Sequence, residues 1–192
     1  MKKLICLGAL SALLLASCGE EKNVTKPDAA EEKEEKVEVE DQTVEEKELV
    51  AYATNITGGT FVKSISLIDN YSIIQFYNDY NEYKKSNPDS LLTEDDYQGY
   101  FDTEETIEKI LVVENVRLLR QFPNLTGAKM TLPFKGKVYS IEMDREAVND
   151  YLGFNVEELK TEDDSWTTKF VNPIGYDEAK RKDFMSKFAK VN

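Results

Sequence analysis

Apolar residues are concentrated at the start of the chain, where they form one short run. Lys2 and Lys3 precede an apolar stretch from Leu4 to Leu15 that only a Gly and a Ser interrupt. A basic start followed by such a stretch is typical of a secretory signal peptide. About a dozen residues are too few for a transmembrane helix, which needs about 20. We therefore expect residues 1–17 to be a signal peptide that is removed.

The next segment contains few residues that a folded core could bury. Residues 19–48 hold 13 Asp and Glu against 5 Lys, with no aromatic residue and no Leu. So few apolar side chains cannot offset the entropy lost when a chain is ordered. We expect residues 18–48 to be a disordered acidic tether and residues 49–192 to form one folded domain.

The first part of this domain is rich in β-forming residues. Alternating apolar and polar positions predict a strand at residues 60–68. An Asp-Asn pair could then turn the chain into a second strand at residues 71–77, forming a β-hairpin. Ile73 and Tyr77 also begin an apolar series at helical spacing, which favours a helix over residues 72–85. The helix is the preferred interpretation, and the hairpin remains an alternative.

The middle of the domain alternates between helical and strand patterns. A capping residue followed by two Glu predicts a helix over residues 102–122, with a break near residues 114–115. Residues 128–132 and 138–143 alternate as two strands on either side of a turn. A short helix over residues 144–152 follows and ends at a Gly.

The last part of the chain completes the predicted fold. Residues 166–171 are expected to form a further strand, and residues 176–191 an amphipathic helix. Helices that flank a β-hairpin are typical of the α+β class. We expect a single small α+β domain in which a mainly antiparallel sheet with a β-hairpin packs against several helices.

Charge and composition exclude several classes of function. The chain has 24 Lys and Arg against 37 Asp and Glu, a formal net charge of −13. Nucleic-acid binding depends on clustered Lys and Arg, so we expect no nucleic-acid partner. The chain also has no His, which removes the imidazole base and the imidazole metal ligand.

The end of the apolar run carries a recognisable motif. Leu15-Ala16-Ser17-Cys18 resembles the lipobox of bacterial lipoproteins. The resemblance implies that signal peptidase recognises Leu15, Ala16 and Ser17, and that Cys18 then carries a diacylglyceryl group and usually a third acyl chain. Two or more chains give stable membrane anchoring. The protein is therefore expected to be held on a membrane through lipid on Cys18, with no thiol left in the folded domain.

The residue after the lipidated cysteine indicates the membrane. In Gram-negative lipoproteins, Asp at this position favours retention in the inner membrane. Here the position is Gly19. The resemblance therefore implies a location in the outer membrane of the cell envelope, on its periplasmic or surface face, if the cell is Gram-negative.

Acidic clusters are the first candidates for chemistry in the domain. Residues 93–96 and residues 161–164 share the sequence Thr-Glu-Asp-Asp, which could bind Ca²⁺. The spacing differs from that of an EF-hand, and a helix cap or a solvated loop is the preferred interpretation. A pair of carboxylates could also support a glycan hydrolase, but no motif selects two of them. We expect no enzyme, no cofactor and no metal.

Tyrosines give the most suggestive pattern for binding. Several fall within 30 residues and alternate with Asn and Asp. Tyr beside Asn and Asp is typical of surfaces that recognise sugars and proteins, although Tyr also packs well in a core. The predicted binding patch consists of Tyr77, Tyr80, Tyr83, Tyr97 and Tyr100.

These observations predict a lipid-anchored envelope protein whose globular domain binds a protein or glycan partner. Two alternatives remain. One is a carboxylate-dependent hydrolase of envelope glycan, and the other is a purely structural assembly lipoprotein.

Overall fold

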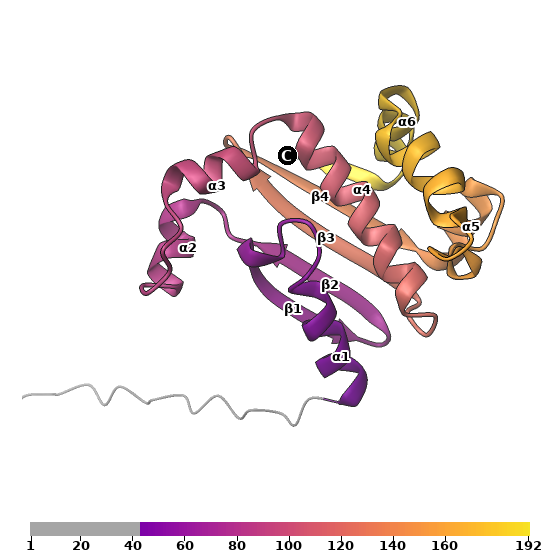
Figure 1. Ribbon diagram of the computed structural model, residues 1–192, viewed down its shortest axis with the longest axis horizontal. Coiled ribbons are helices and arrows are strands. Elements are labelled where there is room, and N and C mark those ends of the chain that lie inside the picture. The colour runs from indigo at the N-terminus through magenta and orange to yellow at the C-terminus, as the bar shows by residue number, and fades with distance from the viewer. Residues whose placement is uncertain (1–42) are drawn as a thin grey trace, which may run out of the picture. The chain divides into compact units, whose positions relative to one another are not determined.

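The structure has two layers, a five-stranded sheet and a set of helices that cover one of its faces (Figure 1). The computed structural model describes residues 43–192. Its strands are β1 (Val62–Ile68), β2 (Tyr71–Phe76), β3 (Gly127–Phe134), β4 (Lys137–Asp144) and β5 (Ala189–Val191). Its α-helices are α1 (Val44–Ala53), α2 (Tyr80–Ser86), α3 (Glu94–Tyr100), α4 (Glu104–Gln121), α5 (Arg145–Leu152) and α6 (Glu178–Phe188). Short 3₁₀ turns are η1 (Gly59–Phe61) and η2 (Val156–Glu158), and η3 (Thr167–Tyr176) is a π-helix.

The strands follow one another in the sheet in chain order. The β1–β2, β3–β4 and β4–β5 pairs are antiparallel. The β2–β3 pair is parallel, and its connection runs through α2, α3 and α4. The predicted α+β class and the mainly antiparallel sheet are therefore confirmed.

Helix α4 lies across the sheet and forms the centre of the core (Figure 1). Strand β3 alternates, so that Ala128, Met130 and Leu132 are buried. Ile107 and Leu111 of α4 are likewise fully buried. Burial of these side chains against one another holds the two layers together.

Several helix and turn signals in the sequence have the expected structural effect. The Thr103 side chain accepts a hydrogen bond from the Thr106 backbone N–H and caps α4. The turn between β3 and β4 places Lys135 and Gly136 at positive φ. Gly153 ends α5 with a φ of 77°, which only Gly adopts without strain. The predicted hairpin at residues 128–143 is thus confirmed.

The helix preferred over residues 72–85 is wrong. Residues 71–76 form strand β2, which pairs with β1 on one side and β3 on the other. A short helix, α2, then starts after Asp79, whose side chain accepts from the Glu82 backbone N–H. The alternative hairpin is correct, because hydrogen bonds from two neighbouring strands outweigh the local helical spacing.

Three further expectations are corrected. Residues 166–171 do not form a strand, because Trp166 stacks on Phe170 at 4.9 Å and the chain continues as the π-helix η3. The terminal helix ends at Phe188, since residues 189–191 pair with β4 as strand β5. The expected break near residues 114–115 is absent, and α4 is one continuous helix.

The described part begins close to the predicted end of the tether. The predicted signal peptide, the predicted lipobox with Cys18 and residues 18–42 of the predicted tether lie outside the described residues. Helix α1 starts at Val44, so the boundary expected between residues 48 and 49 falls inside a helix whose Leu49 is buried. Within residues 43–192, no helix has both the length and the apolar character needed to span a membrane.

Candidate functional site

The predicted tyrosine patch belongs to an aromatic cluster built around one buried phenylalanine. The Phe61 ring packs edge-on against Tyr83 at 5.0 Å and Tyr97 at 4.9 Å between centroids. Tyr100 and Phe101 contact the same ring at 5.6 Å and 5.4 Å. The cluster joins η1 to α2 and α3, so most of these rings contribute to the core.

The structure divides the five predicted tyrosines into different roles. Tyr77 and Tyr83 are buried and cannot contact a partner. Tyr100 is exposed, but its hydroxyl oxygen accepts a hydrogen bond from the Gly58 backbone N–H. Only Tyr80 and Tyr97 are half-buried and line a pocket.

This tyrosine-lined pocket has a volume of about 470 Å³. Its walls come from the start of α2, from α3 and from the β3–β4 turn, which lies next to α3 (Figure 1). Ring surfaces of Tyr80, Tyr97, Phe101 and Phe134 line it. The volume lies within the range of about 300–1,000 Å³ typical of ligand pockets.

The hydroxyl groups of the two tyrosines point away from free solvent. Tyr80 donates to the Leu92 carbonyl oxygen at 3.0 Å, and Tyr97 donates to the Tyr77 carbonyl oxygen at 3.3 Å. Burial, followed by the charge of Asp79, raises the pKa of Tyr97 to about 12. Tyr97 therefore stays protonated at neutral pH, and both tyrosines offer the pocket ring surface and no free hydroxyl.

The rim of the pocket is acidic. Asp79, Glu94 and Asp102 line it, with Lys135 as the cation of this set. Lys135 donates to the Asp102 carbonyl oxygen at 3.1 Å and lies 4.7 Å from the Phe134 ring centroid. A hydrogen bond from Thr106 holds the pKa of the Asp102 carboxyl below its usual range. The rim therefore carries net negative charge at neutral pH.

Sequence reasoning missed part of this pocket. Phe101 and Asp102 directly follow α3, whereas Pro133, Phe134 and Lys135 come from the end of β3 and the turn after it, which only the fold brings to α2 and α3. The signal in the sequence for this wall is the turn between the strands predicted at residues 128–132 and 138–143. Other basic residues near it form ion pairs, as with Lys137 and Glu104 at 2.7 Å.

A second, smaller pocket of about 180 Å³ lies along α4 and contains a buried carboxyl group. The Glu114 side chain is 1 % exposed. Thr57 donates to its Oε1 at 2.6 Å, while Oε2 accepts no hydrogen bond and lies 3.3 Å from Arg117 Nη1. Burial raises the pKa of Glu114, although Thr57 and Arg117 oppose this effect.

The structure also shows where the two Thr-Glu-Asp-Asp clusters and the other candidate carboxylates lie. Thr93 and Asp96 form a capping box at the start of α3, as the preferred interpretation expected. In the second cluster, Asp163 accepts from the Ser165 backbone N–H. Within residues 43–192, no group of three or more potential metal ligands occurs. Among the described residues, three carboxylates, Asp79, Glu94 and Asp102, line the tyrosine-lined pocket, whereas Glu114 is the single carboxylate of the smaller pocket.

Comparisons with models of known protein families, with curated proteins and with solved structures found no match for this chain.

Proposed function

We propose that this chain is a lipid-anchored protein of the bacterial cell envelope, and that its globular domain binds a segment of a partner protein in the tyrosine-lined pocket. The observation that carries the binding proposal is the combination of aromatic walls and an acidic rim in one pocket of about 470 Å³. The anchor is supported by the resemblance of residues 15–18 to a lipobox.

The lining of this pocket suits a segment of a partner protein. Protein interfaces bury apolar and aromatic anchors in a pocket and surround them with a polar rim. Here Tyr97, Phe101 and Phe134 provide the apolar surface, and Asp79 and Glu94 lie at the rim. We therefore expect an apolar side chain in the pocket, with Lys or Arg next to it in the partner. Charge complementarity of this kind favours association and selects the partner.

The anchor has a direct test. Wild-type protein is expected to sediment with membranes, whereas Cys18→Ala is expected to be soluble or to stay as uncleaved precursor. In a Gram-negative cell, fractionation should place the wild type in the outer membrane. A wild-type protein found in the soluble fraction would refute the anchor.

The binding proposal is tested with the full-length chain in zwitterionic micelles and a displayed library of random peptides. Enriched peptides are expected to combine an apolar residue with Lys or Arg. Glu94→Lys reverses an exposed charge at the rim and should weaken these peptides about tenfold or more. Glu146→Lys is the matched control, because Glu146 is also an exposed acid in the first turn of a helix.

The outcomes of this test distinguish a protein partner from a glycan partner. If no peptide is enriched, or if Glu94→Lys and Glu146→Lys bind the peptides equally, the proposal is wrong. A glycan array measured in parallel covers the other expected partner, since flat ring surfaces also suit sugars. Glycan binding that Glu94→Lys abolishes, without peptide binding, would replace a protein partner by a glycan.

A further inference from the structure

We propose that the tyrosine-lined pocket binds a small quaternary ammonium compound of the choline type. The inference rests on the proposed use of this pocket as a binding site, and it names the chemical group that the pocket takes. A trimethylammonium group combines apolar methyl groups with a positive charge. One ligand group therefore suits both the aromatic walls and the acidic rim.

The first argument is the arrangement of the rings. The Tyr80 and Tyr97 rings are 6.3 Å apart between centroids and inclined at 58° to one another. The Phe101 ring lies 5.2 Å from the Tyr97 ring and is inclined at 68° to it. Aromatic rings attract a cation within about 6 Å of the centroid. Rings in such different orientations can contact one compact cation on more than one side.

The second argument is that the two tyrosines offer ring surface without a free hydroxyl. Tyr80 and Tyr97 donate to the backbone carbonyl oxygens of Leu92 and Tyr77. The ammonium group of a Lys side chain has three N–H donors, which must find new acceptors when the group leaves water. A quaternary ammonium group has no N–H and loses no hydrogen bond against a wall of rings. The aromatic part of the pocket therefore suits it better than a Lys side chain.

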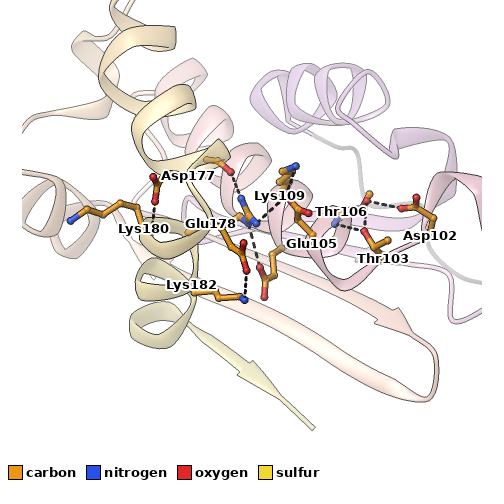
Figure 2. Close-up of polar contacts among 12 residues, drawn as sticks. Asp102, Thr103, Glu105, Thr106, Lys109, Asp177, Glu178, Lys180 and Lys182 are labelled. Carbon is orange, nitrogen blue, oxygen red and sulfur yellow. Dashed lines mark hydrogen bonds and ion pairs between the residues drawn. The ribbon is translucent and has the colours of Figure 1, made fainter.

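The third argument is the charge at the rim. Asp79, Glu94 and Asp102 line the pocket together with one cation, Lys135. Thr106 donates to the Asp102 carboxylate at 2.7 Å (Figure 2), which lowers the pKa of this carboxyl. The net negative charge of these side chains attracts a cation and repels a phosphate. We therefore choose a free ammonium compound over a phosphocholine lipid headgroup.

Lys135 already places one ammonium group beside the aromatic wall. Its Nζ lies 4.7 Å from the centroid of the Phe134 ring and donates to the Asp102 carbonyl oxygen at 3.1 Å. The side chain is exposed, and its positive charge opposes a second cation in the pocket. Removal of this charge should strengthen binding, a gain that damage to the fold would not produce.

The test uses the full-length chain in maltoside micelles, whose headgroups contain no ammonium group. The probes are choline and its neutral analogue, in which a carbon atom replaces the charged nitrogen. Titration calorimetry is expected to show binding of choline, with the neutral analogue weaker by about tenfold. Glycerophosphocholine, the probe for a lipid headgroup, should also bind more weakly than choline.

Variants locate the binding in this pocket. Lys135→Met should bind choline about threefold more tightly, because a nearby positive charge is removed. Lys137→Met is the matched control, since Lys137 is an exposed neighbour that does not line the pocket, and it should match wild type. Glu94→Lys should weaken choline about tenfold. Tyr80→Leu should weaken it by a similar factor, whereas Tyr80→Phe keeps the ring and the affinity.

Several outcomes would overturn the inference. Absence of choline binding, or equal affinity for the neutral analogue, would show that the pocket takes no cation. Wild-type affinity in both Lys135→Met and Glu94→Lys would show that choline binds elsewhere, and these exposed positions carry the test even if Tyr80→Leu fails to fold. Tighter binding of glycerophosphocholine would identify a lipid headgroup as the ligand and would refute the choice of a free compound.

The peptides enriched in the library are measured in the same micelles, which distinguishes this inference from the proposed function. If these peptides bind and choline does not, only the inference of an ammonium ligand fails. If choline binds and no peptide is enriched, only the proposed partner segment fails.

Discussion

Replacing Arg181 by Met is expected to destabilise the domain strongly. Arg181 is the largest fully buried side chain of the described residues and joins α6 to α4. Its Nη1 donates to the Gly175 carbonyl oxygen at 3.0 Å, and its Nε lies 3.3 Å from Glu108 Oε2. Its Nη2 lies 3.4 Å from Glu105 Oε1. Figure 2 shows this junction and labels Glu105.

The expected loss of stability depends on the groups that lose their partner when Arg181 is replaced. Removing one partner of a buried ion pair costs about 3–5 kcal/mol, since the remaining charge is uncompensated. Glu108 is 16 % exposed and can gain little water, whereas Glu105 is 55 % exposed and can be solvated. The Gly175 carbonyl also loses its donor. We therefore expect Arg181→Met to lower the free energy of unfolding by about 3 kcal/mol, at the lower end of this range.

The assay is urea unfolding of the full-length chain at neutral pH, followed by far-ultraviolet circular dichroism. Lys182→Met is the matched control on the next residue of α6. Lys182 also pairs with a carboxylate, Glu178, at 2.6 Å, but both side chains are mostly exposed. Exposed pairs of this kind contribute less than about 1 kcal/mol, so the control should stay close to wild type.

A double variant tests whether the uncompensated charge of Glu108 causes the loss of stability. Adding Glu108→Gln to Arg181→Met removes the carboxylate that the first substitution leaves uncompensated. The double variant should therefore be more stable than the sum of the two single variants predicts. If Arg181→Met costs no more than Lys182→Met, the buried ion pairs contribute no net stability and the argument fails.

Two further predictions concern helix ends and pH. Thr93→Ala removes the hydroxyl that caps the Asp96 backbone N–H but keeps the backbone N–H that donates to the Asp96 carboxylate, and it should lower the midpoint of urea unfolding by an amount equivalent to about 1 kcal/mol; an unchanged midpoint would mean that the Thr93 hydroxyl does not stabilise α3. Glu114 has a raised pKa, so the folded state binds its proton more tightly than the unfolded state does. Wild type should therefore lose stability relative to Glu114→Gln as the pH rises above the ordinary value of 4.5, and parallel stability curves from pH 4 to pH 8 would contradict this.

Elements with strong local signals could be predicted from the sequence. The helix α4 has a capping Thr103, acids in its first turn and a sustained apolar stripe, and all three agree with one structure. The β3–β4 hairpin has alternation on both sides of a turn that contains Gly136. Where local preferences and burial favour the same element, the sequence pattern is sufficient to predict that element.

Elements that depend on distant partners could not be predicted. Residues 71–76 fit a helix and a strand about equally well, and the choice is made by parallel pairing with β3, more than 50 residues further on. Residues 189–191 continue a helical pattern but pair with β4. For residues 166–170, the same apolar side chains suit a strand, yet Trp166 and Phe170 stack within η3.

The candidate site shows the same division. The density of tyrosines could be recognised in the sequence, but their exposure could not, because Tyr77 packs against Tyr83 and Tyr83 packs against Phe61. The buried position of Glu114 had no signal in the sequence beyond a polar residue inside an apolar stripe. A polar residue inside an apolar stripe predicts a break in the helix, whereas Glu114 lines a pocket on a continuous helix.

By itself, the sequence determined the α+β class, the ends of the strongest helices and the acidic charge, and it carries the resemblance to a lipobox on which the proposed anchor rests. These properties depend on residues close together in the chain, whose preferences act without the rest of the fold. The tertiary structure decided the strand at residues 71–76, the π-helix and the composition of both pockets. Each of these depends on contacts between distant segments, whose free energy exceeds the small local preferences that a sequence pattern records.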